Sequence, residues 1–280
     1  MDHIEILIII IEFKVLAGKS ILKIMDDHIQ LILIRVCKEA IMIIEKDRFQ
    51  FYADNNGSPD VLLYAPTMQG QLFDYIVQNK IKKIALCGGG TPTQDYLDTI
   101  RKFTWIEYIN GYCKGLDFSF LNNLENLKVY IGTLDFTLEN KAIKELYVTW
   151  SSKAKISNRC SNLEIINIEK GKSFSSLFSE GIPNKLKSVT LVRNSLTDFL
   201  TTTDNFSIEH LELSYCSKLK SLKGIENFNS LKQIRLINCK NLEDISSLVS
   251  LKNLQELTIY KCPSIAQDSI NELKTNVRLI

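Results

Sequence analysis

Apolar residues recur in one frame along most of this chain. Each occurrence starts at an apolar residue and has an apolar residue or tyrosine three and five positions later, with steps of 19 to 23 residues between starts. The starts are Ile81, Phe103, Leu124, Ile143, Leu163, Leu186, Ile208, Leu231 and Leu254. The step from the third to the fifth position is strand alternation, so both side chains are expected to point inward. The period predicts stacked repeats whose apolar edges cover one another, because one repeat cannot bury its edge alone.

Eight residues after each start, the chain has a small residue or one that can hydrogen-bond locally. These residues are Gly89, Gly111, Gly132, Ser151, Gly171, Asn194, Cys216, Cys239 and Cys262. We expect the chain to leave the strand here and turn in a narrow space. The last three cysteines lie 23 residues apart and should stack along the inner turn. Buried reduced thiols are favoured there over a disulfide or a metal site, which fits a cytosolic protein.

The segment Leu231-Lys-Gln-Ile234-Arg-Leu236-Ile-Asn-Cys239 resembles the leucine-rich repeat family. The stretch that follows, Leu242-Glu-Asp-Ile245, is similar to the 22-residue subclass of internalins and protein phosphatase regulators. The resemblance covers residues 81–280 and weakens toward the N-terminus. It implies a right-handed α/β solenoid with nine repeats, parallel strands on the concave face and short irregular or 3₁₀ segments on the convex face. It also implies a function in binding other proteins.

The first eighty residues do not follow the repeat frame. Residues rich in Ile, Val and aromatics predict strands at 4–13, 28–36, 40–45, 48–53 and 60–64, and a helix over 72–79. An open solenoid end exposes apolar core and a strand edge, so we interpret residues 1–80 as a β-rich capping region. Within it, residues 42–80 form the cap proper, and residues 1–41 are either an extra part of the cap or poorly ordered. A second helix over 268–275 closes the last repeat.

Charge and hydropathy exclude several function classes. The 34 basic and 32 acidic residues nearly cancel, which gives no attraction toward nucleic acid or anionic membranes. The apolar run Ile6–Ile11 is too short to span a bilayer and lacks the features of a cleavable signal peptide. We therefore expect no membrane insertion and a cytoplasmic location, or alternatively export as an effector without a cleavable signal.

Three motifs are candidate sites of chemistry. Gly18-Lys19-Ser20 follows an apolar strand as in a phosphate-binding loop, but Phe13 stands where the first glycine is needed. Gly88-Gly89-Gly90 follows a strand without the helix opening of a dinucleotide site. The histidines His3, His28 and His210 are scattered, without metal or catalytic spacing. We expect no enzyme activity, no cofactor and no metal.

The concave face remains as the candidate binding surface. Strand alternation places the second, fourth and sixth positions of each repeat outward, with the seventh at the rim. Aromatic and charged residues at these positions are typical of protein-binding hot spots. The predicted contact residues are Trp105, Glu107, Lys128, Tyr130, Tyr147, Trp150, Asn167, His210, Glu212, Tyr215, Arg235 and Tyr260.

The sequence thus predicts non-catalytic protein recognition, with the partner unidentified. One setting is an intracellular adaptor or an immunity-type protein that neutralises a toxin, and another is an exported bacterial effector. The competing hypothesis is a nucleotide-binding protein built on Gly18, Lys19 and Ser20. A third is a self-assembling structural repeat.

Overall fold

The computed structural model describes residues 43–86, 92–113, 115–197, 207–273 and 277–279. The chain divides into two compact units, Met1–Pro92 and Thr93–Ile280, which we call the N-terminal and C-terminal units. The 80/81 boundary drawn from the sequence stays a prediction. The capping role of residues 1–41, the motif Gly18-Lys19-Ser20 and the glycines Gly88 to Gly90 lie outside the described residues.

The described part of the N-terminal unit begins with a β-meander. Strands β1 (Ile43–Lys46) and β2 (Phe49–Ala53) pair antiparallel, and β2 pairs antiparallel with β3 (Pro59–Leu63). The turn between β1 and β2 has positive φ at Asp47 and Arg48, the geometry that a tight two-residue hairpin requires. The expected strands at 48–53 and 60–64 are thus confirmed to within a few residues, and the strand at 40–45 is confirmed from residue 43 onward. The expected strands at 4–13 and 28–36 lie outside the described residues.

A helix then carries the chain back to the same sheet. Helix α3 (Gln69–Asn79) buries Leu72 and Ile76, four residues apart on one face. The residue that follows it, Lys80, is in the left-handed conformation and ends the helix. Strand β4 (Lys83–Ala85) then pairs parallel to β3. The expected helix over 72–79 therefore begins three residues earlier than predicted.

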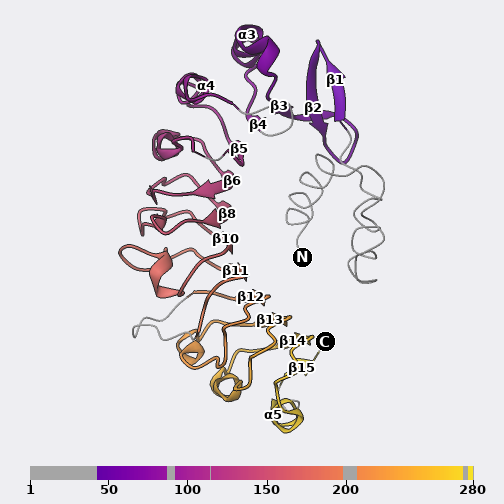
Figure 1. Ribbon diagram of the computed structural model, residues 1–280, viewed down its shortest axis with the longest axis vertical. Coiled ribbons are helices and arrows are strands. Elements are labelled where there is room, and N and C mark those ends of the chain that lie inside the picture. The colour runs from indigo at the N-terminus through magenta and orange to yellow at the C-terminus, as the bar shows by residue number, and fades with distance from the viewer. Residues whose placement is uncertain (1–42, 87–91, 114, 198–206, 274–276, 280) are drawn as a thin grey trace. The chain divides into compact units, whose positions relative to one another are not determined.

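The C-terminal unit is a stack of parallel strands, each from a successive layer of the chain (Figure 1). The strands pair in the order β5 (Tyr108–Gly111), β6 (Val129–Leu134), β8 (Glu145–Trp150), β10 (Ile165–Glu169), β11 (Ser188–Val192), β12 (His210–Ser214), β13 (Gln233–Ile237), β14 (Glu256–Tyr260) and β15 (Arg278–Leu279). Strand β15 was not predicted. The expectation of an α/β fold with a mostly parallel sheet is confirmed.

Leu236 illustrates how neighbouring layers cover each other. It pairs with Leu213 on one side and Ile259 on the other. Leu213 and Leu236 are fully buried, as are the inward residues two positions earlier in the same strands. Each layer therefore shields the apolar edge of the next, which is the packing expected from the repeat frame.

The entries to β6, β8 and β10 to β14 share a repeated backbone motif. The carbonyl of Lys232 accepts the amides of Gln255 and Glu256 at 2.8 and 3.0 Å, and the carbonyl of Glu107 does the same for Lys128 and Val129. The same pair of bonds recurs at Lys128, Lys144, Glu164, Lys187 and Glu209. All these layers therefore enter the sheet with one backbone geometry.

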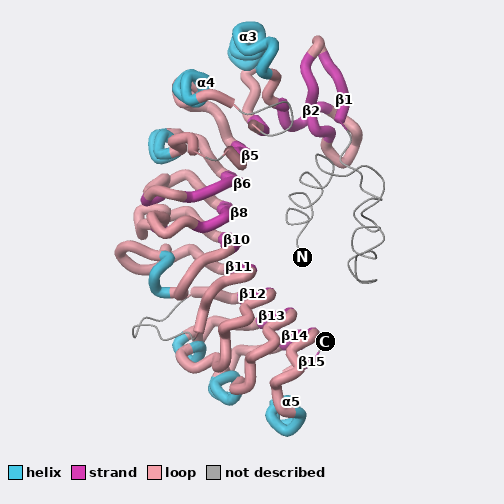
Figure 2. Tube along the Cα trace, viewed as in Figure 1, coloured by secondary structure: helices cyan, strands magenta, loops and turns pink. Residues whose placement is uncertain are grey.

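The return segments lie on the side opposite the strands (Figure 2). They contain short 3₁₀ helices at Ser119–Asn123, Ser175–Leu177, Ile225–Asn227 and Ser246–Ser250. Two short strands, β7 (Thr137–Leu138) and β9 (Lys155–Ile156), pair parallel there. Irregular and 3₁₀ return segments agree with the expectation for the side away from the strands.

One helix of the C-terminal unit precedes β5, and another lies between β14 and β15. Helix α4 (Gln94–Ile100) was not predicted, although Thr93 caps it by accepting the amide of Tyr96 at 3.3 Å. Helix α5 (Gln267–Leu273) matches the predicted C-terminal helix over its described residues.

The predicted frame is wrong by three residues in two layers. Tyr130 pairs with Leu146, and Ile109 pairs with Tyr130, so these layers start at Ile106 and Leu127 rather than Phe103 and Leu124. The fifth positions of the shifted frame are Gly111 and Gly132, which are not apolar, so the apolar pattern favoured the wrong frame. Gly111 and Gly132 consequently lie within strands β5 and β6 and not in turns.

Candidate functional site

The outward side chains of β8 to β14 form the surface predicted to bind a partner, and we call it the strand face. Inward and outward residues alternate in β12, where Leu211 and Leu213 point into the core and His210, Glu212 and Ser214 point outward. The same alternation runs through the paired strands, so outward residues line up in rows across the sheet.

One outward row is a chain of polar contacts across four strands. His210 Nδ1 lies 2.9 Å from Gln233 Oε1, and Gln233 Nε2 donates to Glu256 Oε2 at 2.8 Å. Arg278 Nη1 lies 3.6 Å from Glu256 Oε1. Each side chain is therefore held in position by its neighbours in the adjacent layers.

A second row contains an ion pair that is partly shielded from solvent. Arg235 Nη1 lies 2.9 Å from Glu212 Oε2, and Ser214 Oγ donates to Glu212 Oε1 at 2.8 Å. The Glu212 side chain is 11% exposed and that of Arg235 is 46% exposed. The carboxylate is thus covered while the guanidinium remains accessible to a partner.

Several predicted contact residues do lie on the strand face, with different accessibility. His210, Arg235 and Tyr260 are partly or fully accessible. Tyr147, Asn167 and Glu212 point outward but are buried. Tyr147 donates its hydroxyl to Glu145 Oε2 at 2.9 Å. The side chains of these three residues therefore support the strand face but present little area to a partner.

The shifted frame moves Trp105, Glu107 and Lys128 off the strand face. All three precede their strands, because β5 starts at Tyr108 and β6 at Val129. Trp105 stacks on Phe103 with ring centroids 5.1 Å apart. Lys128 Nζ and Glu107 Oε2 form a 2.6 Å ion pair at the strand entry.

Tyr130 is not on the strand face, contrary to the prediction. It points inward, is fully buried and lies near Phe118, with ring centroids 5.9 Å apart. Its hydroxyl donates to the carbonyl of Thr133 at 2.9 Å. A Cβ at Gly132 would lie 2.5 Å from this hydroxyl, so the glycine is what makes room for the ring. Burial raises the pKa of Tyr130 well above its ordinary value, so the phenol stays neutral.

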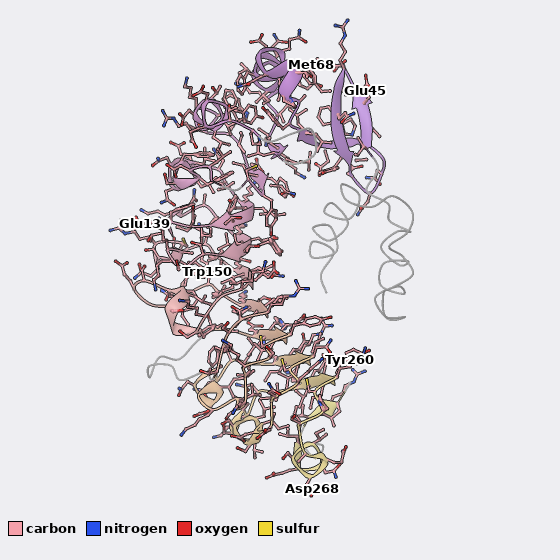
Figure 3. The ribbon with its side chains drawn as sticks, viewed as in Figure 1. Glu45, Met68, Glu139, Trp150, Tyr260 and Asp268 are labelled. Atoms are coloured by element: carbon pink, nitrogen blue, oxygen red, sulfur yellow. The ribbon has the colours of Figure 1, made fainter. Side chains whose placement is uncertain are left out.

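The ends of the strands form a further row of side chains, which we call the strand-end row. It consists of Lys170, Arg193, Tyr215, Asn238 and Lys261, all with φ between 51° and 66°. The left-handed backbone aims the amide of Tyr215 at the carbonyl of Ile237, 2.8 Å away in the next layer. The guanidinium of Arg193 lies 5.7 Å from the centre of the Tyr215 ring. Of the two predicted rim aromatics, Tyr215 is in this row, and Trp150 lies at the end of β8 (Figure 3).

In the layers from β11 to β14, the position after the strand-end row ties each layer to the one before it. Cys239 Sγ donates to the carbonyl of Leu213 at 3.4 Å, and Cys262 Sγ to that of Leu236 at 3.6 Å. Asn194 Nδ2 donates to the carbonyl of Ile168 at 2.8 Å. The predicted stack of buried thiols is present, and these cysteines are free and buried.

The thiols of this stack interact with one another. The hydrogen bond to Cys216 raises the pKa of Cys239 to about 12, and the hydrogen bond to Cys239 raises that of Cys262 further. The same contact with Cys239 lowers the pKa of Cys216. Cys239 and Cys262 therefore remain protonated near neutral pH, which suits structural donors more than nucleophiles.

Metal-binding clusters and membrane-spanning helices are both absent from the part of the chain that the structure describes. Within them, no group of three or more His, Cys, Asp or Glu side chains is arranged to hold a metal ion. The helices described have neither the length nor the apolar character to cross a membrane. The nucleotide-site hypothesis for Gly18, Lys19 and Ser20 falls outside the described residues and stays a hypothesis.

One feature was missed at the sequence level. A small pocket opens where the layers beginning at Ile143 and Leu163 leave their strands, lined in part by Trp150, Lys155, Lys170 and Lys172. The sequence signal was the spacing of these lysines just after two successive strands, which places them in neighbouring layers.

Comparison with protein-family models and with curated proteins gives no match for this chain.

Proposed function

We propose that the C-terminal unit is a leucine-rich repeat solenoid that binds another protein through its strand face, without catalysis. The repeat type is supported by register spacings of 22 and 23 residues from β11 to β14 and by the inward Leu and Ile rows. The Asn and Cys donors that follow these strands also support it.

The observation that carries the binding proposal is the cross-strand order of the polar side chains. His210, Gln233 and Glu256 already hold one another before a partner arrives, and Arg235 is held by Glu212. A preorganised surface loses less side-chain entropy on binding, and that loss is about 0.5–1.5 kcal/mol for each mobile side chain. Arg235 and Tyr260 are accessible residues of the types that dominate binding energy.

The dimensions of the strand face suit a protein partner. Strands spaced about 4.8 Å apart and rising about 3.3 Å per residue give the strand face, from β8 to β14, a flat area of roughly 450 Å². Each side of a standard interface buries about 800 Å². A partner of ordinary size would therefore cover the strand face and extend onto the strand-end row.

A matched pair of variants tests this proposal. The variant Arg235→Gln/Tyr260→Ala alters the strand face, and the amide of the introduced glutamine can still donate to Glu212. The variant Lys218→Gln/Val249→Ala removes the same charge and a smaller apolar group from exposed positions off that face. Both should unfold at the wild-type denaturant concentration.

Tagged wild-type and variant chains are then used to capture partners from cells under identical conditions. We expect a protein retained by the wild type and by the Lys218/Val249 variant to be lost, by about tenfold or more in affinity, from the Arg235/Tyr260 variant. Equal retention by both variants would place binding elsewhere and contradict the proposal.

A further inference from the structure

The pocket beside Trp150 has the composition of an anion-binding site. It has a volume of about 100 Å³ and is lined by Trp150, Ser151, Lys155, Lys170, Lys172 and Ser176, among others. Three of these side chains are cationic, and among the described lining residues none is acidic. Such a concentration of one charge raises the local concentration of anions.

The positive charge of the pocket is only partly compensated. Lys155 Nζ donates to the carbonyl of Ser176 at 2.7 Å, which fixes its ammonium against one wall without neutralising it. Lys170 Nζ lies 3.6 Å from Glu169 Oε1. That same carboxylate oxygen lies 3.0 Å from Arg193 Nη1. One acid therefore serves two bases, and the lysines of the pocket keep a net positive charge.

Trp150 gives the pocket an apolar wall beside the cations. It is half-buried and belongs to β8, whereas Lys170 and Lys172 come from the following layer. An indole face can stack on a flat or aliphatic group, while lysines bind a phosphate as mobile point charges. The pocket thus combines an apolar surface for a carbon group with positive charges for an anion attached to that group.

We propose that this pocket receives a phosphate monoester carried on a side chain of the protein partner. This inference rests on the proposed function and names a chemical feature of the partner. A phosphate monoester carries a charge of about −1.5 to −2 and three acceptor oxygens, which matches three ammonium groups better than a single carboxylate does. The pocket borders the strand-end row through Lys170, so a partner covering that row reaches it.

Trp150 can report on its own ligand. The sequence contains two tryptophans, and Trp105→Phe leaves Trp150 as the only one while keeping a ring to stack on Phe103. Phenyl phosphate is titrated into this variant, and Trp150 fluorescence is followed, with benzoate and inorganic phosphate as comparison ligands. We expect saturable quenching by phenyl phosphate and weaker binding of both other ligands, by about tenfold, since each lacks either the second charge or the ring.

Two charge-matched variants in the same background identify the site. Lys170→Gln/Lys172→Gln should weaken phenyl phosphate binding by about tenfold. Lys218→Gln/Lys252→Gln removes two exposed lysines that do not line the pocket and should leave binding within about twofold of the background. All of these lysines are exposed, so the denaturation midpoints should not move.

Four results would overturn the inference. These are no saturable quenching, equal affinities for benzoate and phenyl phosphate, equal losses in the two lysine variants, or inorganic phosphate binding as tightly as phenyl phosphate. The last result would indicate a free phosphate site without a carrier. If the strand-face variant loses its partner while phenyl phosphate fails to bind, the proposed function stands and only this inference falls.

Discussion

The layers from β11 to β14 and the layers from β5 to β8 form the same parallel sheet by different means. The strands from β11 to β14 are paired at sequence spacings of 22 and 23 residues. The earlier strands are paired at 21 and 16 residues, read from Ile109, Tyr130 and Leu146. The parallel pairing of the strands is therefore maintained in the earlier layers, although the length of those layers varies.

The two regions also satisfy their interior polar groups differently. In the later layers, a cysteine or asparagine just after the strand donates to a carbonyl of the preceding layer. In the earlier layers, Tyr130 fills the space above Gly132, and the buried Asn140 ties the chain together. Asn140 donates to the carbonyls of Leu121 and Leu124 and accepts the amides of Ala142 and Ile143. In the earlier layers, the Tyr130 ring and the fully hydrogen-bonded side-chain amide of Asn140 thus replace the repeated side-chain donor of the later layers.

The largest expected effect lies in the regular layers. Leu236→Asp buries an unpaired charge between Leu213 and Ile259 and should cost about 4 kcal/mol or more, which is a large part of the stability of a typical domain. Chemical denaturation followed by circular dichroism measures this loss. Thr258→Asp on the outward side, next to Arg235, should change the free energy of unfolding by about 0.5 kcal/mol or less. Similar losses for both would contradict the assignment of inward and outward faces.

The irregular layers are tested by adding a single methyl group. Gly132→Ala places a Cβ 2.5 Å from the Tyr130 hydroxyl and 2.6 Å from the carbonyl of Gly111, so we expect a loss of about 2–3 kcal/mol. Gly70→Ala, in helix α3 with open space around it, should be neutral or slightly stabilising. A Gly132→Ala protein as stable as the wild type would contradict the inward orientation of the Tyr130 side chain.

A smaller effect compares the two kinds of donor after the strand. Asn194→Ala leaves the carbonyls of Ile168 and Val192 without this partner and should cost about 2 kcal/mol. Cys239→Ala removes the longer, weaker bond of a thiol and should cost about 1 kcal/mol. Thermal and denaturant unfolding give both values. The reverse order would mean that packing of the sulfur, and not hydrogen bonding, governs this position.

The smallest effect is on pH dependence. Burial raises the pKa of Cys160 to about 12 from an ordinary value near 9. The folded protein then keeps the proton that the unfolded chain releases, so this stabilising contribution is complete below pH 9 and declines as pH rises from 9 to 12. The decline is about 1 kcal/mol by pH 10. Cys160→Ala should therefore lose less stability between pH 8 and 10 than the wild type, and parallel curves would count against the burial argument.

The sequence predicted the later layers well because each inward position there holds an aliphatic residue. Leu213, Leu236 and Ile259 follow one another in register, as the frame required. In the earlier layers an inward position holds Gly132, and a glycine at this place in the linear sequence resembles a turn residue. Gly132 makes room for Tyr130 only in the folded structure, so the apolar pattern alone favoured the wrong frame.

The candidate surface was predictable only in part. Strand alternation correctly placed His210, Arg235 and Tyr260 outward. It could not foresee that Glu212 would be covered by its own ion pair, since burial of an outward residue depends on the adjacent layers. The pocket at Trp150 joins residues from two layers and a return segment, a proximity that the linear pattern does not contain.

The left-handed backbone of the strand-end row restricts which residues can be tolerated there. A β-branched side chain in this conformation is a steric outlier, and even an unbranched one costs about 1–2 kcal/mol relative to glycine. Valine, isoleucine and threonine should therefore be selected against at Lys170, Arg193, Tyr215, Asn238 and Lys261. Fewer residue types are therefore available for contacts with a partner along the strand-end row. A randomised library for new ligands should omit the β-branched residues at these five positions from the outset.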